Sequence, residues 1–104
     1  MIGVDLVFLP EFEQQLSTGG EAFIERTFSL TEMKNRKTEH LAGLWAAKEA
    51  VIKAAETAPK AYTDIVITHD QAGKPCAHVG SQAFAISIAH HGEYAVAVAY
   101  RIDQ

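Results

Sequence analysis

The sequence has 104 residues, of which 48% are hydrophobic and 21% are charged. This composition excludes an intrinsically disordered protein and predicts one globular domain, residues 1–104. The formal net charge of -4 argues against a general nucleic-acid binder, because such a protein needs a basic face to meet the phosphate backbone.

Cysteine content and hydropathy indicate the compartment. Cys76 is the single cysteine, so an internal disulfide and a CxxC metal pair are both excluded, which fits a reducing environment. The first residues lack the positive region and long apolar stretch of a signal peptide, and no window is as long and apolar as a membrane span. We expect a cytoplasmic protein.

The first 28 residues predict a strand and two short helices. Residues 1–8 alternate between bulky apolar side chains and a less bulky face that carries Asp5, as in a strand. Pro10 suits the first turn of a short helix, which we expect to end where residues 17–20 read Ser-Thr-Gly-Gly. Residues 21–28 repeat the apolar spacing and predict the second helix.

Residues 29–32 offer a serine or threonine cap with an acidic residue behind it, which predicts the start of a third short helix.

A central helix is the clearest element. Residues 39–56 are then rich in alanine and leucine and contain no proline and no glycine other than Gly43. Pro59 marks the exit from this helix.

The second half of the chain changes to a period of two and predicts two hairpins. Their strands and turns are expected at residues 64–68, 70–75, 77–79, 83–89, 90–93 and 94–100. Both strands of the last hairpin have one bulky face and one face of alanine and serine, against which a helix could lie very close. We therefore predict an α+β fold in which an antiparallel sheet packs on the alanine-rich helix.

Three ionisable side chains interrupt the apolar stretch 41–55, and they are Lys48, Glu49 and Lys53. Glu49 and Lys53 are four residues apart, so they share one helix face and could form a surface ion pair of a few tenths of a kcal/mol. Their neighbours, however, are mostly alanine, valine and isoleucine. In such surroundings a carboxylate needs a cation and a lysine needs an anion, so the two can also point into one site.

Asp5 poses the same question on the first strand. It lies between Val4 and Leu6, either as an edge residue that faces water or as a partly buried group that needs a partner. If Asp5 and Glu49 meet, a hard divalent cation would hold both ionised, and Mg²⁺ accepts one or two carboxylates together with water and substrate phosphate oxygens. Lys53 could then neutralise the same phosphate.

The remaining polar motifs are weak by themselves. The turn 73–75 lacks the length and glycine spacing of a phosphate-binding loop, and it needs no function beyond that of a hairpin turn. His90 and His91 are typical of solvated turn residues. Their spacing with His69, Cys76 and His78 matches no standard zinc site.

The whole set of segments resembles the short, single-domain holo-acyl-carrier-protein synthases, a group of the 4′-phosphopantetheinyl transferase superfamily. The similarity spans nearly the full length, in a consistent order and spacing. It rests on residues 2–7, 23–26, 28–32, 41–43, 45–50, 53–54, 73–75, 86–90 and 94–95.

The resemblance implies a Mg²⁺-dependent transferase of fatty-acid and lipid biosynthesis. Such an enzyme moves the phosphopantetheine arm of coenzyme A to a serine of an acyl carrier protein and releases adenosine 3′,5′-bisphosphate. It is a homotrimer that binds coenzyme A at subunit interfaces. The residues carried over are Asp5 and Glu49 as metal ligands, Lys53 on the pyrophosphate, His90 near the phosphates, and Lys48, Gly73, Lys74 and Pro75 as further coenzyme A contacts.

The chain also departs from its relatives. Many of them carry arginines just before the Ala-Ala-Lys-Glu segment and along the first helix, where this chain has residues 43–45 and 11–15 without any basic side chain. Residues 55–60 replace a glycine-rich loop. The alternatives are therefore a noncatalytic trimeric subunit that binds coenzyme A or assists assembly, and a different metal-dependent phosphate enzyme.

Overall fold

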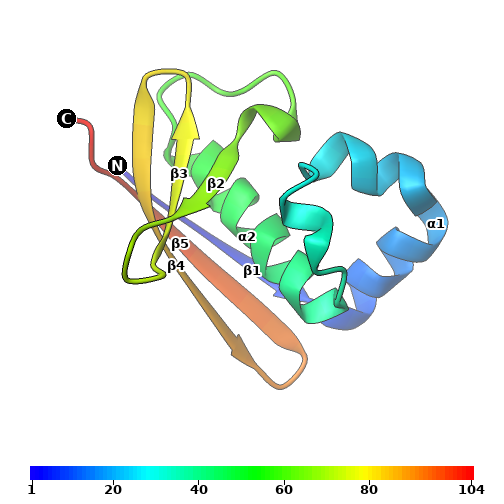
Figure 1. Cartoon of the computed structure of the whole chain (residues 1–104). Helices are drawn as coiled ribbons and strands as arrows, with labels where there is room; N and C mark the ends of the chain where they lie inside the picture. The colour runs from blue at the N-terminus through cyan, green and yellow to red at the C-terminus, as the bar shows by residue number, and fades with distance from the viewer.

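The computed structural model describes residues 1–104 and confirms the α+β fold (Figure 1). Five strands form one sheet of order β1-β5-β4-β3-β2, in which every neighbouring pair is antiparallel. The elements are β1 (Ile2–Phe8), α1 (Leu9–Thr27), η1 (Glu32–Lys34), α2 (Thr38–Ala54), η2 (Tyr62–Asp64), β2 (Val66–His69), β3 (Pro75–Val79), β4 (Gln82–His91) and β5 (Tyr94–Arg101).

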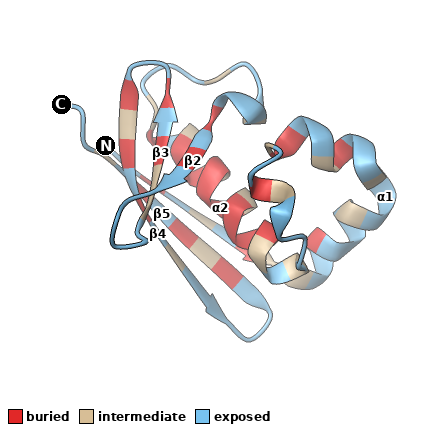
Figure 2. Cartoon of the chain, viewed as in Figure 1, coloured by how far each residue is buried: buried red, intermediate tan, exposed pale blue.

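Helix α2 crosses one face of the sheet and forms the centre of the core. It packs on β1, β5 and β4, and α1 packs on its far side. Figure 2 shows the buried residues along α2 and on the strands beneath it. Alanines at 46, 47 and 50 have no exposed surface, and their small side chains let helix and sheet approach closely. No helix is long and apolar enough to cross a membrane.

Helix α1 is longer than expected. Ser17 and Thr18 remain helical, and only Gly20 leaves the helix, with φ 58° and ψ −152°, so the two expected helices join across a kink. Ser29 and Glu32 bond reciprocally, because the Ser29 amide donates to Glu32 and the Glu32 amide donates to the Ser29 hydroxyl, but the residue that precedes the next element is Thr31, whose side chain makes no cap hydrogen bond. The element that follows is a 3₁₀ turn rather than an α-helix.

The expectation that both strands of the last hairpin turn their small face to the helix is half wrong. On β5 the alanines at 95, 97 and 99 face α2, but on β4 the bulky Phe84 and Ile86 do so. Register explains the difference, since Ile86 lies opposite Ala99 and cross-strand partners share a face. Helix α2 therefore lies over the alanines of β5, and the large side chains of β4 fill the space beside the helix.

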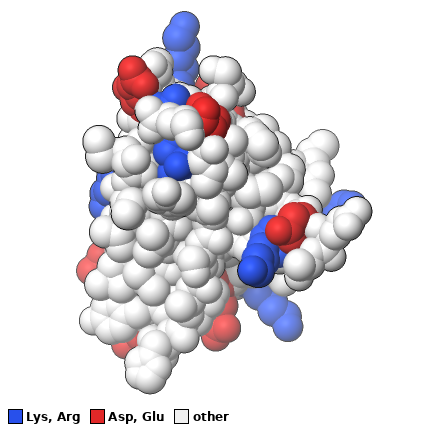
Figure 3. Space-filling view, turned by 90° about the vertical axis from the view of Figure 1, so that its left-hand side faces the viewer, with Lys and Arg blue, Asp and Glu red and all other residues white.

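The opposite face of the sheet is open and apolar. Ile2, Val4 and Leu6 of β1 point away from α2 and lie opposite Tyr100, Val98 and Val96 of β5 in the register. Val4 is 54% exposed and Leu6 is 62% exposed. In Figure 3 the strand side of the molecule has few Lys, Arg, Asp or Glu side chains except at its margins.

The last hairpin turns later than expected. Strand β4 continues through His90 and His91, and the turn lies at Gly92 and Glu93, where Gly92 has φ 56°. The two histidines are therefore strand residues that alternate between the two faces, not turn residues. His90 lies on the helix side and His91 pairs with Tyr94.

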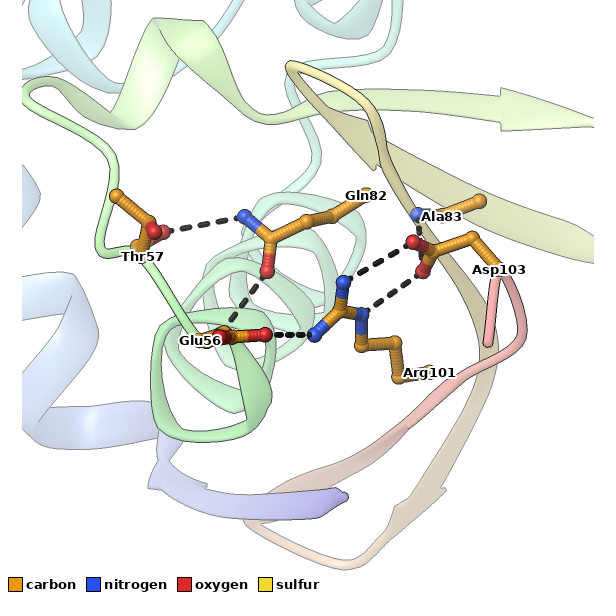
Figure 4. Close-up of polar contacts among 6 residues, drawn as sticks. All are labelled: Glu56, Thr57, Gln82, Ala83, Arg101 and Asp103. Carbon is orange, nitrogen blue, oxygen red and sulfur yellow. Dashed lines mark hydrogen bonds and ion pairs between the residues drawn. The ribbon is translucent and has the colours of Figure 1, made fainter.

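A polar network ties the C-terminus to the segment that follows α2 (Figure 4). Arg101 donates to both oxygens of Asp103 at 2.9 and 3.1 Å and to Glu56 at 2.9 Å. Gln82 accepts from the Glu56 amide at 2.9 Å and donates to the Thr57 carbonyl at 3.2 Å. Because β4 and the C-terminal segment both bind Glu56 or Thr57, the network fixes the start of the 55–61 connection.

Candidate functional site

The site begins where β1 meets α2. Gly3 faces the helix so closely that a Cβ atom there would lie 2.0 Å from the carbonyl oxygen of Ala50. Two residues along the same face, Asp5 is directed towards α2, and its side chain is 17% exposed. Asp5 is therefore the partly buried strand carboxylate that the sequence left open, and it does not face bulk water.

Asp5 and Glu49 line one cavity of about 210 Å³. Phe12 and Trp45 form part of its apolar wall, and Glu11 adds a third carboxylate to the lining. The cavity thus brings together groups from β1, α1 and α2. Asp5 and Glu49 therefore line the same cavity, and their role as metal ligands stays a prediction.

Lys53 pairs with the strand rather than with its helical neighbour. Its ammonium donates to Asp5 at 3.1 Å and to the Val4 carbonyl at 2.9 Å, and the side chain is 53% exposed. No ion pair forms between Glu49 and Lys53, so the surface-pair alternative does not describe this structure. Lys53 instead connects α2 to the carboxylate of β1 and keeps an exposed surface for an anion.

Tyr62 is a site residue that the sequence reasoning missed. Its hydroxyl donates to Glu49 Oε1 at 2.7 Å, and its ring packs on Trp45 with centroids 4.8 Å apart. Burial and then the hydrogen bond to Glu49 together raise the pKa of Tyr62 to about 12, so the phenol is a neutral donor. Thirteen residues and an irregular segment separate the two, and no motif joins them.

Lys48 does not reach the cavity. Its side chain has no exposed surface, and its ammonium bonds to Glu32 and to the Thr27 carbonyl at 2.8 Å each and to the Tyr62 carbonyl at 3.2 Å. Burial lowers the pKa of Lys48, and the bond to Glu32 opposes this shift. Lys48 therefore cannot contact a bound ligand in this conformation, contrary to the expectation that it contacts coenzyme A.

The other expected residues lie elsewhere in the chain. His90 Nε2 is 2.9 Å from the Glu39 carbonyl, and its ring lies against Gly43, near the start of α2, whereas Asp5 and Lys53 meet near its end. Gly73 and Lys74 belong to the β2–β3 connection and Pro75 begins β3, whereas β1 and β2 are opposite edges of the sheet. One chain therefore brings Asp5, Glu49 and Lys53 together but not His90 or residues 73–75.

The donor set suits a hard cation. No group of three or more His, Cys, Asp or Glu side chains is placed to hold a metal ion by protein ligands alone. Two carboxylates from different elements nevertheless share one cavity, and a cation of the Mg²⁺ type needs only one or two of them. Asp5 and Glu49 fit such an ion, with its remaining positions left to water and to substrate oxygens.

Comparison with known proteins gives one family. The family model described as the 4′-phosphopantetheinyl transferase superfamily matches residues 1–99. A holo-[acyl-carrier-protein] synthase from Sulfurovum sp. is 36% identical over 94% of this chain and 92% of its own length.

Solved structures that resemble this chain belong to the same kind of protein. The Helicobacter pylori holo-[acyl-carrier-protein] synthase in complex with coenzyme A has a TM-score of 0.87 at 27% identity and covers 98% of this chain and 100% of its own. A holo-(acyl-carrier-protein) synthase from Bacillus anthracis in complex with CoA (3′,5′-ADP) has a TM-score of 0.79 at 32% identity and covers 96% of this chain and 93% of its own.

Proposed function

Because the chain belongs to the 4′-phosphopantetheinyl transferase superfamily, we propose that it is a holo-acyl-carrier-protein synthase. It transfers the 4′-phosphopantetheine group of coenzyme A to a serine of an apo acyl carrier protein or carrier domain. The serine oxygen bonds to the phosphorus that bears the pantetheine arm, and the phosphorus–oxygen bond to adenosine 3′,5′-bisphosphate breaks. The observation that carries this proposal is the meeting of Asp5 and Glu49 in one cavity beside Lys53.

Asp5 and Glu49 would hold Mg²⁺ in this site. When bound, the ion supplies charge neutralisation for the pyrophosphate and for the departing bisphosphate. The two carboxylates come from β1 and α2. The close contact of Gly3 with α2 fixes the relative position of these elements, so the separation of the carboxylates is set before the substrate arrives. This preorganisation supports the assignment.

Lys53 would contact the pyrophosphate. Its ammonium is held by Asp5 and the Val4 carbonyl on one side, and more than half of its side chain is exposed on the other. A lysine in this position offers a point charge to a phosphate without leaving Asp5. It would stabilise negative charge on the leaving bisphosphate.

Assembly would complete the site. The open face of β1 and β5 carries exposed Ile2, Val4, Leu6, Val98 and Tyr100, an apolar surface of the kind that marks a protein interface. We place a homotrimer contact there, with coenzyme A between subunits. His90 and the 73–75 turn, which lie far from Asp5 in one protomer, would then reach the nucleotide from a neighbouring copy.

Mass spectrometry tests the transfer. The protein is incubated with coenzyme A, Mg²⁺ and a panel of apo carriers, including carrier domains cut from large synthases. A phosphopantetheine mass on a serine is expected. Glu49→Gln and Asp5→Asn should each abolish the transfer while the thermal unfolding curve stays cooperative. Full activity of both variants would overturn the metal assignment.

A noncatalytic subunit on the same scaffold is the second candidate. The absence of basic residues among positions 11–15 favours it, since α1 presents Glu11 and Glu13 instead. No transfer to any carrier, together with intact coenzyme A binding, would establish this reading. For the enzyme, we propose the cytoplasm and fatty-acid or related lipid synthesis as its setting.

A further inference from the structure

One hydrogen bond holds the Glu49 side chain, and Tyr62 donates it. The phenol oxygen lies 2.7 Å from Glu49 Oε1, while Oε2 accepts no hydrogen bond from the protein. The carboxylate is thus fixed through one oxygen and open at the other. Because Glu49 lines the cavity that it shares with Asp5, the open oxygen is available to a ligand there.

Tyr62 is itself held by the helix that carries Glu49. Its ring packs on Trp45, four residues before Glu49, and its carbonyl accepts from Lys48, the residue just before Glu49. The Lys48 ammonium is fully buried and is fixed further by Glu32 and the Thr27 carbonyl. This anchoring accounts for a lysine in an alanine-rich helix that does not contact the cavity.

The segment that leads to Tyr62 is fixed at its other end as well. Gln82 binds the backbone of Glu56 and Thr57, and Arg101 binds the Glu56 carboxylate (Figure 4). The side chain of Asp64 accepts from the Ala61 amide just before Tyr62. The phenol is therefore presented by a segment that is tied down at both ends and not by a free loop.

We propose that Tyr62 is a positioning residue that sets the orientation of Glu49 for a divalent cation held with Asp5. The inference rests on the proposed function, since it assigns a role within the same site. A hydrogen bond to one oxygen of a metal-binding carboxylate fixes its rotamer and directs the other oxygen to the metal. Loss of such an outer partner typically lowers metal affinity roughly 10- to 100-fold.

Tyr62→Phe is the matched substitution, because it removes the hydroxyl and keeps the ring on Trp45. Mn²⁺, used as the probe for Mg²⁺, is titrated into the protein with coenzyme A present and followed by its electron paramagnetic resonance signal. The Mn²⁺ dissociation constant should rise by at least roughly 10-fold. Thr63→Ala, an exposed change in the same turn, should leave the constant unchanged.

Kinetics separate positioning from a general structural loss. For Tyr62→Phe the Mg²⁺ concentration at half-maximal rate should rise by the same factor. The rate should return at saturating Mg²⁺, and the KM for coenzyme A should then equal that of the unmodified protein. A rate that saturating Mg²⁺ does not restore would overturn the positioning role.

A double-mutant cycle covers the case in which Tyr62→Phe perturbs the fold. In the Glu49→Gln background the Tyr62 change should add no further loss of Mn²⁺ affinity, and an additive loss would overturn the inference. Equal Mn²⁺ affinity of Tyr62→Phe and the unmodified protein would also overturn it, while leaving the transferase intact. If the unmodified protein binds no Mn²⁺ and transfers nothing, the proposed function fails instead.

Discussion

Gly3 lies directly against the carbonyl oxygen of Ala50, at a distance that no side chain can occupy. A Cβ atom at residue 3 would lie 2.0 Å from that oxygen and 3.0 Å from the Ala54 nitrogen, both of which are backbone atoms. Neither can move without displacing α2 from β1. The strand that carries Asp5 and the helix that carries Glu49 therefore depend on this contact for their spacing.

Gly3→Ala should disturb the site and the fold together. Overpacking of this kind costs about 1–3 kcal/mol, and the enforced shift of β1 also moves Asp5 relative to Glu49. Urea denaturation and the transfer rate measure the two effects. Gly80→Ala, in a turn with no neighbouring atom within 4 Å but a φ of 57°, provides a control in which stability falls and the rate per folded molecule does not. An unchanged transfer rate in Gly3→Ala would show that this contact does not set the spacing of Asp5 and Glu49.

Lys48→Met should destabilise the protein strongly. It leaves the Glu32 carboxylate buried without its cation and frees the carbonyls of Thr27 and Tyr62. Removal of one partner of a buried ion pair costs about 3–5 kcal/mol of unfolding free energy. Denaturation in urea measures this loss.

Lys53→Met is the matched control on the same helix. Lys53 is half exposed, so the loss should stay below about 1 kcal/mol. Adding Glu32→Leu to Lys48→Met should recover part of the stability, because no buried charge then remains uncompensated. Equal losses for the two lysine variants would contradict the structural role of Lys48.

The sequence predicted the sheet and the central helix, because both depend on local periodicity and on the types of residue present. Residue types raised the meeting of Asp5 and Glu49 only as a condition, and their assignment to one metal site came from the family resemblance and stays a prediction. The sequence did not predict which face of β4 packs on α2. That choice depends on the register that places Ile86 beside Ala99, and register is a property of the paired strands.

Tyr62 and Lys48 show a second limit. Tyr62 reaches Glu49 only because an irregular segment folds back over α2, and a lone tyrosine has no spacing that would reveal this. Lys48 and Glu49 are adjacent charges in one apolar stretch, so sequence alone treated both as site residues. A helix turns them in different directions, one into Glu32 and the other into the cavity.

Val98→Lys should dissociate the proposed trimer. Val98 lies in the middle of the open sheet face, opposite Val4, and a buried lysine without a partner at a subunit contact is costly. Light scattering should change from a trimer to a smaller species, and transfer should fall if, as proposed, neighbouring subunits complete the site. Ala22→Lys, exposed on α1, should change neither property. A trimer that survives Val98→Lys would place the contact on another surface.

Asp103 should make the stability of the folded protein depend on pH in the acid range. Hydrogen bonds from Arg101, and then from the Ala83 amide, hold the pKa of this carboxyl well below its usual range. A carboxyl whose pKa is depressed by folding contributes stability above its unfolded pKa of about 4 and loses that contribution as the pH falls. Asp103→Asn should therefore lower the melting temperature at pH 7. The difference in melting temperature between this variant and the unmodified protein, here called the gap, should narrow as the pH falls from 5 to 2.

The control for this pH series is Glu13→Gln, an exposed change on α1, which should give no gap at any pH. A gap for Asp103→Asn that stays constant across the series would mean that the asparagine acts through packing and not through charge. A narrowing gap would show that the carboxylate, by holding Arg101 against Glu56, secures the C-terminal strand to the segment that leads to Tyr62.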